Sequence, residues 1–177
     1  GELTKAGRDY EAILAIDPDH ADANHLLGVV SGQLGNIEQA IQYVEASLRT
    51  DPDQPSALNN LGNLFAEADR LNDAIESYRR AITLQPAYAE AFHNLGNVLG
   101  DNGQLAEAVV AFKTAVQLQP DDVPSRLALG SACERVGDID LAAESFREVL
   151  VIDESSIAAL NRLGAVLRNN DDLTEAK

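Results

Sequence analysis

Apolar residues follow one another along this chain at helical spacing, in short stripes that come in pairs. Within residues 89–102, the apolar positions of the first stripe are Phe92, Leu95, Val98 and Leu99. Spacings of three, three and one residues place these side chains on one face of an α-helix. The second stripe consists of Leu105, Ala108, Val109, Phe112, Ala115 and Val116. The segment therefore predicts two amphipathic helices joined by a tight turn.

Glycine and proline mark the ends of the predicted helices. Gly103 separates the two stripes, and glycine readily adopts the left-handed conformation found just beyond a helix C-terminus. In other segments the same place is taken by Gly35, Asp69, Gly137 and Asp171. Proline follows the second stripe, because it lacks an amide hydrogen and clashes with the preceding turn. The closing prolines are Pro18, Pro52, Pro86 and Pro120, which predicts helix, turn, helix, turn along the chain.

The pattern repeats at a fixed period. Five glycines stand 34 residues apart, namely Gly28, Gly62, Gly96, Gly130 and Gly164. An alanine follows each of them by twelve residues, at Ala40, Ala74, Ala108, Ala142 and Ala176. An aromatic or branched residue follows the first four by sixteen residues, at Val44, Tyr78, Phe112 and Phe146. Such spacing indicates an internal repeat, which decides the architecture before any single residue does.

The order Leu-Gly, Ala, aromatic residue and Pro at this period resembles the tetratricopeptide repeat signature. The resemblance implies an all-α tetratricopeptide repeat solenoid, a right-handed superhelix of antiparallel helix pairs. We expect a single array over residues 1–177, with four complete repeats and partial repeats at both ends. Its units are a half repeat at 1–20, full repeats at 21–54, 55–88, 89–122 and 123–156, and a partial repeat at 157–177. In the last unit, a new helix is predicted over 173–177.

Glycine inside a helix costs about 1 kcal/mol relative to alanine, so the aligned glycines need a packing reason. We expect each glycine to let two helix backbones approach closely, with the alanine twelve residues later filling the space. Gly96→Leu or Ala108→Phe is then expected to overpack this contact, at a cost of about 1–3 kcal/mol of stability.

The charge balance is strongly acidic, with 29 Asp and Glu against 13 Lys and Arg and a formal net charge of −16. Nucleic acids and anionic membranes attract basic surfaces, so we expect neither as a partner. Solvation of exposed helix faces explains the acidic excess, and a preference for basic partners is the alternative. No apolar run is long enough to span a membrane.

The single cysteine, Cys133, has no partner for an intramolecular disulfide, which fits a reducing compartment. Equivalent positions in other repeats carry Phe65, Leu99 and Leu167. We therefore expect Cys133 to be a small buried apolar side chain rather than a reactive thiol. A cytoplasmic location is the expectation, although Gly1 opens the chain in the middle of a repeat, as if the true N-terminus were missing.

The first helix of each repeat has a polar face, formed by residues three and two before the aligned glycine and one and four after it. In the tetratricopeptide family this face lines the concave groove that holds ligands. The central repeats carry Asn59, Asn60, Asn63, His93, Asn94 and Asn97 at these positions. Asparagine offers both a donor and an acceptor, so such a row can bind peptide amides without reading side chains. Toward the C-terminus the groove carries Arg135, Arg162 and Arg168, which can attract an acidic ligand segment.

This row is similar to the asparagine ladder in the repeat superhelix of O-linked N-acetylglucosamine transferase, which grips extended protein segments. The matching positions are Asn60 and Asn94, whereas Leu26, Ala128 and Arg162 interrupt the ladder. Solvated helix surface, or hydrogen bonding between adjacent helices, is the alternative interpretation of the asparagines. The family's carboxylate clamp for chaperone tails needs a lysine three residues before a glycine, and no repeat has one.

No combination of residues predicts catalysis, a metal site or a cofactor. His25 and His93 stand in equivalent places two repeats apart, or roughly 20 Å from the usual spacing of packed helices, too far to share a metal or a proton. The aspartates gather in the turns between repeats, where turn and cap chemistry explains them.

The sequence thus predicts a protein-interaction scaffold that binds an extended peptide or a partner helix in the concave groove. One alternative is a substrate-presenting arm of a larger enzyme, such as a glycosyltransferase. Another is a self-assembly module, because the apolar stripes at the ends lack a polar capping helix. The expected partner is accordingly a protein or peptide, or a second copy of this chain.

Overall fold

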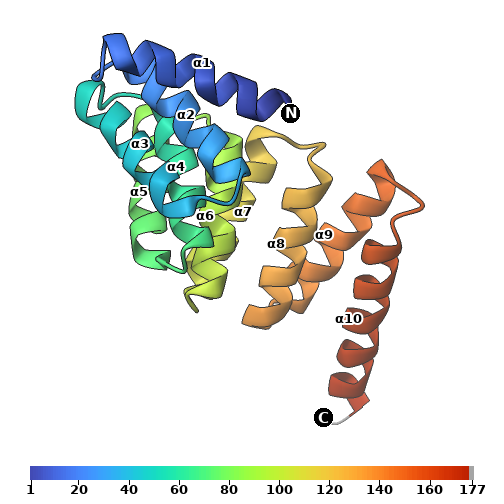
Figure 1. The fold of residues 1–177 in the computed structure, drawn as a ribbon. Helices are drawn as coiled ribbons and strands as arrows, with labels where there is room; N and C mark the ends of the chain where they lie inside the picture. The colour runs from blue at the N-terminus through green and yellow to red at the C-terminus, as the bar shows by residue number, and fades with distance from the viewer. Residues whose placement is uncertain (176–177) are drawn as a thin grey trace. The chain divides into compact units, whose positions relative to one another are not determined.

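The computed structural model describes residues 1–175, and all regular secondary structure in this part of the chain is α-helical (Figure 1). The prediction of an all-α fold is confirmed. The helices are α1 (Glu2–Ile16), α2 (Ala21–Gln33), α3 (Ile37–Thr50), α4 (Pro55–Glu67), α5 (Leu71–Leu84), α6 (Ala89–Asp101), α7 (Leu105–Leu118), α8 (Val123–Val136), α9 (Ile139–Ile152) and α10 (Ile157–Glu175).

The chain divides into two compact units, Gly1–Ala87 and Tyr88–Lys177. The first contains α1–α5 and the second α6–α10. The even-numbered helices are the first helices of the predicted repeats, and the odd-numbered ones are the second helices. The assignment of residues 1–177 to one array with the repeat boundaries given above stays a prediction.

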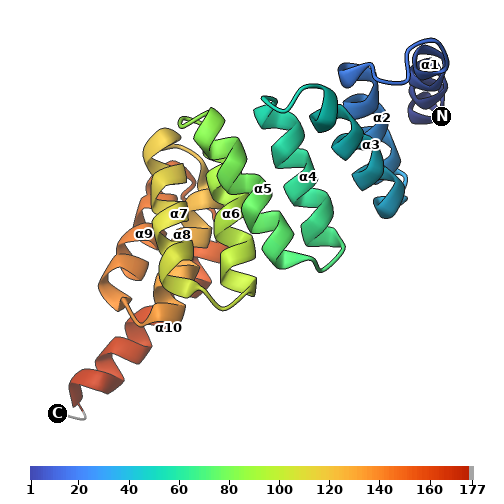
Figure 2. The same ribbon diagram turned by 90° about the vertical axis from the view of Figure 1, so that its left-hand side faces the viewer.

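In the first unit, two helix hairpins follow a single helix (Figure 2). α2 pairs with α3 and α4 with α5, while α1 packs against α2 and α3 against α4. The interior contains side chains with almost no exposed surface, among them Val44, Leu58 and Tyr78. Because α4 lies between α3 and α5, these two helices do not pack against each other.

The second unit is built in the same way. α6 pairs with α7 and α8 with α9, while α7 packs against α8 and α10 against α9. Its fully buried side chains include Leu99, Phe146 and Val149. Burying a side chain of this size contributes about 1.5–3 kcal/mol, so stacked hairpins stabilise the unit without a single central core.

Four turn residues adopt the left-handed conformation predicted after the first helix of a hairpin. Gly35, Gly103 and Gly137 have φ angles of 80°, 78° and 91°, and Asp69 has a φ of 58°. The following amide in each turn donates a hydrogen bond back to a carbonyl of the preceding helix. This bond closes the turn and satisfies one of the carbonyls that the helix end leaves open.

The prediction of a break at Asp171 is wrong, since α10 continues without interruption from Ile157 to Glu175. The left-handed conformation costs a residue other than glycine roughly 1–2 kcal/mol. At Asp69, the packing of α5 against α4 offsets this cost. At Asp171 the backbone avoids the cost by staying helical.

In three repeats the aligned glycine faces a ring on the paired helix, whereas Gly28 faces Val44. A Cβ added to Gly62, Gly96 or Gly130 would lie between 2.5 and 2.9 Å from three ring atoms of one aromatic side chain. The prediction that the alanine twelve residues later fills this space is therefore wrong for these three repeats. The ring belongs to the residue one helical turn beyond that alanine, on the same face of the second helix. The facing rings are those of Tyr78, Phe112 and Phe146.

Candidate functional site

The predicted binding residues of the first unit all lie on α4. Asn59 is only 1% exposed, so the prediction that it lies on a solvent-facing surface is wrong. Its neighbours Ala57 and Leu58 have no exposed surface either. The buried face of α4 is therefore wider than its apolar pattern indicates.

The other two asparagines of α4 are half-buried and contact neighbouring helices. Asn60 Nδ2 lies 2.8 Å from His25 Nε2, which joins α4 to α2. Asn63 Oδ1 accepts a hydrogen bond of 2.7 Å from the Tyr78 hydroxyl, which joins α4 to α5. Both side chains thus help to hold the unit together, as the alternative interpretation of the asparagines states.

In the second unit, His93, Asn94 and Asn97 lie on α6. His93 Nδ1 is 2.8 Å from Ser125 Oγ on α8, and its ring packs against Phe112 with centroids 5.7 Å apart. Asn94 is half-buried, and Asn97 is exposed. The row thus presents its most accessible amide at Asn97.

A pocket of about 280 Å³ opens between α6 and α8, beside His93. Asp122 accepts a hydrogen bond of 2.9 Å from the Ser125 amide and so caps the N-terminus of α8. With Glu90, it gives the pocket two carboxylates. The remaining lining residues are Ala89, Gln119 and Pro124.

Two of the three predicted arginines already contact other residues of this chain. Arg135 Nη2 donates to the Gly100 carbonyl at 3.0 Å, joining α8 to α6. Arg162 Nη1 lies 3.2 Å from Glu134 Oε2, joining α10 to α8. Arg168 is exposed on α10. Attraction of an acidic ligand segment by these arginines stays a prediction.

Burial is the main cause of the shifted pKa values of His25 and Cys133. Burial lowers the pKa of His25 below its usual 6.5, against the raising effect of Asp22. Burial also raises the pKa of the Cys133 thiol to about 11, with Asp138 adding to the shift and Lys113 opposing it. Cys133 has no exposed surface, so the prediction of a small buried side chain is confirmed. A protonated, inaccessible thiol is a poor nucleophile.

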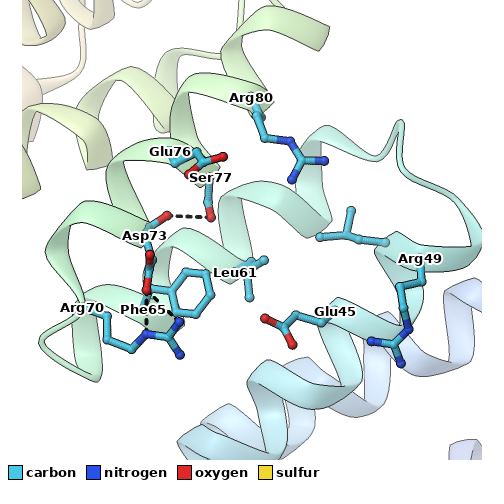
Figure 3. Close-up of a pocket in the computed structure, with 10 residues that line it drawn as sticks. Glu45, Arg49, Leu61, Phe65, Arg70, Asp73, Glu76, Ser77 and Arg80 are labelled. Atoms are coloured by element: carbon cyan, nitrogen blue, oxygen red, sulfur yellow. Dashed lines mark hydrogen bonds and ion pairs between the residues drawn. The ribbon is translucent and has the colours of Figure 1, made fainter.

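The sequence interpretation missed a second surface, which we name the α4 groove (Figure 3). It is a cavity of about 430 Å³ over α4, between α3 and α5. Its apolar lining consists of Leu48, Leu61 and Phe65. Its polar lining consists of Glu45 and Arg49 from α3, Arg70 at the N-terminus of α5, and Asp73, Glu76, Ser77 and Arg80 from α5.

One arginine of the α4 groove is fixed in place. The Arg70 guanidinium stacks over the Phe65 ring, with Cζ 4.2 Å from the ring centroid. Its Nε and Nη2 atoms lie 2.7 and 2.6 Å from Asp73 Oδ2. The concentration of arginine near this groove in an acidic chain was the sequence signal that could have revealed it.

The described residues contain neither a metal-binding cluster nor a membrane-spanning helix. No group of three or more His, Cys, Asp or Glu side chains there could hold a metal ion. None of the helices in the described part of the chain is long and apolar enough to cross a membrane.

The stacked hairpins define a helical-repeat protein, and sequence comparison identifies the kind of repeat. Family models described as tetratricopeptide or TPR repeats match residues 1–64, 62–103, 89–122 and 123–156. The chain belongs to the tetratricopeptide repeat family, whose members serve as scaffolds for protein interactions. No curated protein matches the chain by sequence.

Solved structures with the same fold include MamA and YrrB. One MamA structure is 27% identical, with a TM-score of 0.83 over 87% of this chain and 90% of that chain. MamA 41-end from Desulfovibrio magneticus RS-1 is 22% identical, with a TM-score of 0.81 over 89% of each chain. YrrB, described as a TPR protein with an unusual peptide-binding site, is 22% identical, with a TM-score of 0.79 over 90% of this chain and 82% of that chain.

Proposed function

We propose that this chain is a protein-interaction scaffold whose first helices bind an extended peptide or a helix of a partner protein. The observation that supports this function most is the pocket between α6 and α8. It opens beside His93, on the helices where the sequence pattern predicts binding. The exposed amide of Asn97 and the half-buried amide of Asn94 lie on the same helix.

The chemistry of this surface fits a peptide backbone. Each asparagine amide supplies donors and an acceptor, which match the carbonyl and amide groups of an extended chain. The carboxylates of Glu90 and Asp122 favour a basic rather than an acidic side chain in the pocket. The net charge of −16 favours the same preference over a longer range.

Peptides selected from a random display library on the wild-type chain test this function. Asn94→Ala/Asn97→Ala should weaken their binding roughly tenfold, because a hydrogen bond contributes about 0.5–1.5 kcal/mol. Gln117→Ala, on the exposed face of α7, is the matched control and should bind as the wild type does. Unchanged affinity of the double variant, with helical content preserved by circular dichroism, would contradict the proposal.

The parallel variant in the first unit is Asn60→Ala/Asn63→Ala. Because Asn63 accepts the Tyr78 hydroxyl hydrogen bond, its thermal midpoint must be measured beside its affinity. Loss of peptide binding at a temperature where the variant stays folded would place a peptide contact on α4 as well.

Self-association is a second candidate function, favoured by apolar side chains exposed on the last two helices. Val151 is 83% exposed, Ile157 72% and Leu160 51%. Apolar groups that gather on a surface mark interaction sites. Light scattering should then show a mass that rises with concentration in the wild type and not in Ile157→Glu. The third possibility, a substrate-presenting arm of a larger enzyme, rests on the asparagine row alone.

A further inference from the structure

We propose that the α4 groove docks an amphipathic helix of a partner protein, one that carries an apolar residue between a basic and an acidic residue on the same face. This surface lies between second helices, whereas the proposed function concerns first helices. Each proposal can therefore be tested independently of the other.

The shape of the α4 groove suits a helix. α3 and α5 flank α4 without packing against each other, which leaves a channel along α4. Leu61 and Phe65 are each 5% exposed at its base. A third helix packs into such a depression with its axis about 8–10 Å from its neighbours, and apolar anchors on one face fill the base.

The charges on the rims are ordered by sign along the groove. On α3, Glu45 precedes Arg49 by one helical turn, and on α5, Glu76 precedes Arg80 by one turn. In the 34-residue register the two pairs are offset by only three residues. As second helices of successive hairpins, α3 and α5 run in the same direction. In register, the carboxylates of Glu76 and Glu45 therefore come first along the groove and the guanidiniums of Arg80 and Arg49 follow, with Glu45 and Arg80 only one residue apart.

These four charges are available to a partner. Among the residues that the structure describes, none of Glu45, Arg49, Glu76 and Arg80 forms an ion pair. Arg70 differs, since it is already held by Asp73 and Phe65. A partner helix with one basic and one acidic residue can satisfy both ends at once, and only in one direction. Charge complementarity of this kind fixes register and orientation.

The basic end is particular to this groove. The residues in register with Arg49 in other repeats are Ala15, Thr83, Gln117 and Val151, and those in register with Arg80 are Ala12, Ala46, Thr114 and Glu148. No other repeat thus places arginine at either position. Ordinary helix solvation does not require this pairing, since any charged or polar residue solvates an exposed helix face.

The chain contains a natural, smaller version of the same groove. The equivalent cavity over α2 measures about 280 Å³, against about 430 Å³ over α4. At the position of the small Ser77, the α2 cavity is lined by Tyr43, which stands 34 residues earlier. The larger side chain reduces the space, so Ser77→Tyr should narrow the α4 groove with a residue that the fold already accepts at that position.

Two synthetic amphipathic helices serve as probes, with binding followed by fluorescence anisotropy. The first carries Lys, Leu and Glu in this order along one face, and the second carries Lys in place of Glu. The wild type should bind the first at least tenfold more tightly. Arg49→Glu/Arg80→Glu makes both ends of the groove acidic and should reverse this preference. Arg147→Glu, an exposed arginine outside the groove, is the charge control and should keep the wild-type order.

Two substitutions of Ser77 distinguish the effect of groove volume from the effect of the serine hydroxyl. Ser77→Tyr should weaken binding of the Lys-Leu-Glu helix at least tenfold, whereas Ser77→Ala should leave it unchanged. Ser77→Ala removes only a hydroxyl that donates to the Asp73 carbonyl at 2.8 Å. The proposal is overturned if Ser77→Tyr binds as the wild type does, or if the wild type does not distinguish the probes. It is also overturned if a wild-type dimer disappears in Ser77→Tyr, because the occupant is then a second copy of this chain.

Discussion

The contact between Gly96 and Phe112 offers the most direct test of how each hairpin is held together. A Cβ at residue 96 would lie 2.7, 2.7 and 2.8 Å from three atoms of the Phe112 ring. Carbon atoms in contact prefer about 3.5–4.0 Å, so even the first added atom comes roughly 0.7–1.3 Å too close to the ring. The ring is 4% exposed and has His93 against it, so it cannot easily move away.

Gly96→Leu is therefore expected to destabilise the protein by about 2 kcal/mol. Overpacking of a filled core costs about 1–3 kcal/mol, and three overlapping ring atoms favour the upper part of this range. The higher helix propensity of leucine offsets somewhat less than 1 kcal/mol of this cost. Gly7→Ala is the control with opposite sign, because its Cβ would meet Val30 and Leu27 at ordinary distances of 3.5 and 3.9 Å. Gly7→Ala should therefore raise the free energy of unfolding by up to about 1 kcal/mol.

Urea unfolding followed by circular dichroism measures both variants, and Phe112→Ala completes the test. Phe112→Ala alone should cost about 3–5 kcal/mol, since it leaves a cavity. In the double variant the leucine enters the space of the lost ring. The stability loss of the double variant should therefore be at least about 1 kcal/mol smaller than the sum of the two single losses. An unchanged midpoint for Gly96→Leu, or strictly additive losses in the double variant, would refute the contact.

Three further predictions concern single residues. Because burial lowers the pKa of His25, the unfolded chain binds its proton first as pH falls below 6.5. Stability due to this histidine is thus present above pH 6.5 and lost below it, and His25→Asn should flatten the fall in urea midpoint between pH 7.5 and 5. Cys133, with a pKa raised to about 11 and no exposed surface, should react with a thiol reagent at pH 8 only in denaturant; labelling of the native chain within minutes would contradict its burial. Asp69→Gly should raise the thermal midpoint, because φ is 58° at this residue. Gly103→Ala, at a φ of 78°, should lower the thermal midpoint, because it reduces the free energy of unfolding by roughly 1 kcal/mol. Shifts of both midpoints in the same direction would contradict the turn argument.

The fold could be predicted from the sequence because the same columns recur in every repeat. Gly103 and Pro120 mark helix ends through local backbone chemistry, which does not depend on distant contacts. Asp171 shows the limit of this reasoning, since the same position ends a helix in one repeat and continues it in another. The difference depends on whether a second helix packs there, which is a tertiary property.

The candidate sites were less predictable, because side-chain partners come from helices far apart in the sequence. Asn63 has the pattern of a groove residue, yet its acceptor is used by Tyr78. Asn59 is buried in spite of its polarity. The α4 groove draws its walls from three helices, and Ser77 matters there mainly through the space it leaves empty. Such an empty space is not visible in a single column of the repeat.

The pairing of glycine and ring has a consequence for how arrays of this kind change length. Gly62 and Tyr78, like Gly130 and Phe146, stand sixteen residues apart and belong to the same hairpin. A genetic duplication or deletion of one 34-residue module therefore carries both halves of the contact together. Neither the lengthened nor the shortened chain then contains a ring without its facing glycine. Recombination at whole-module boundaries therefore preserves this glycine–ring contact within each hairpin.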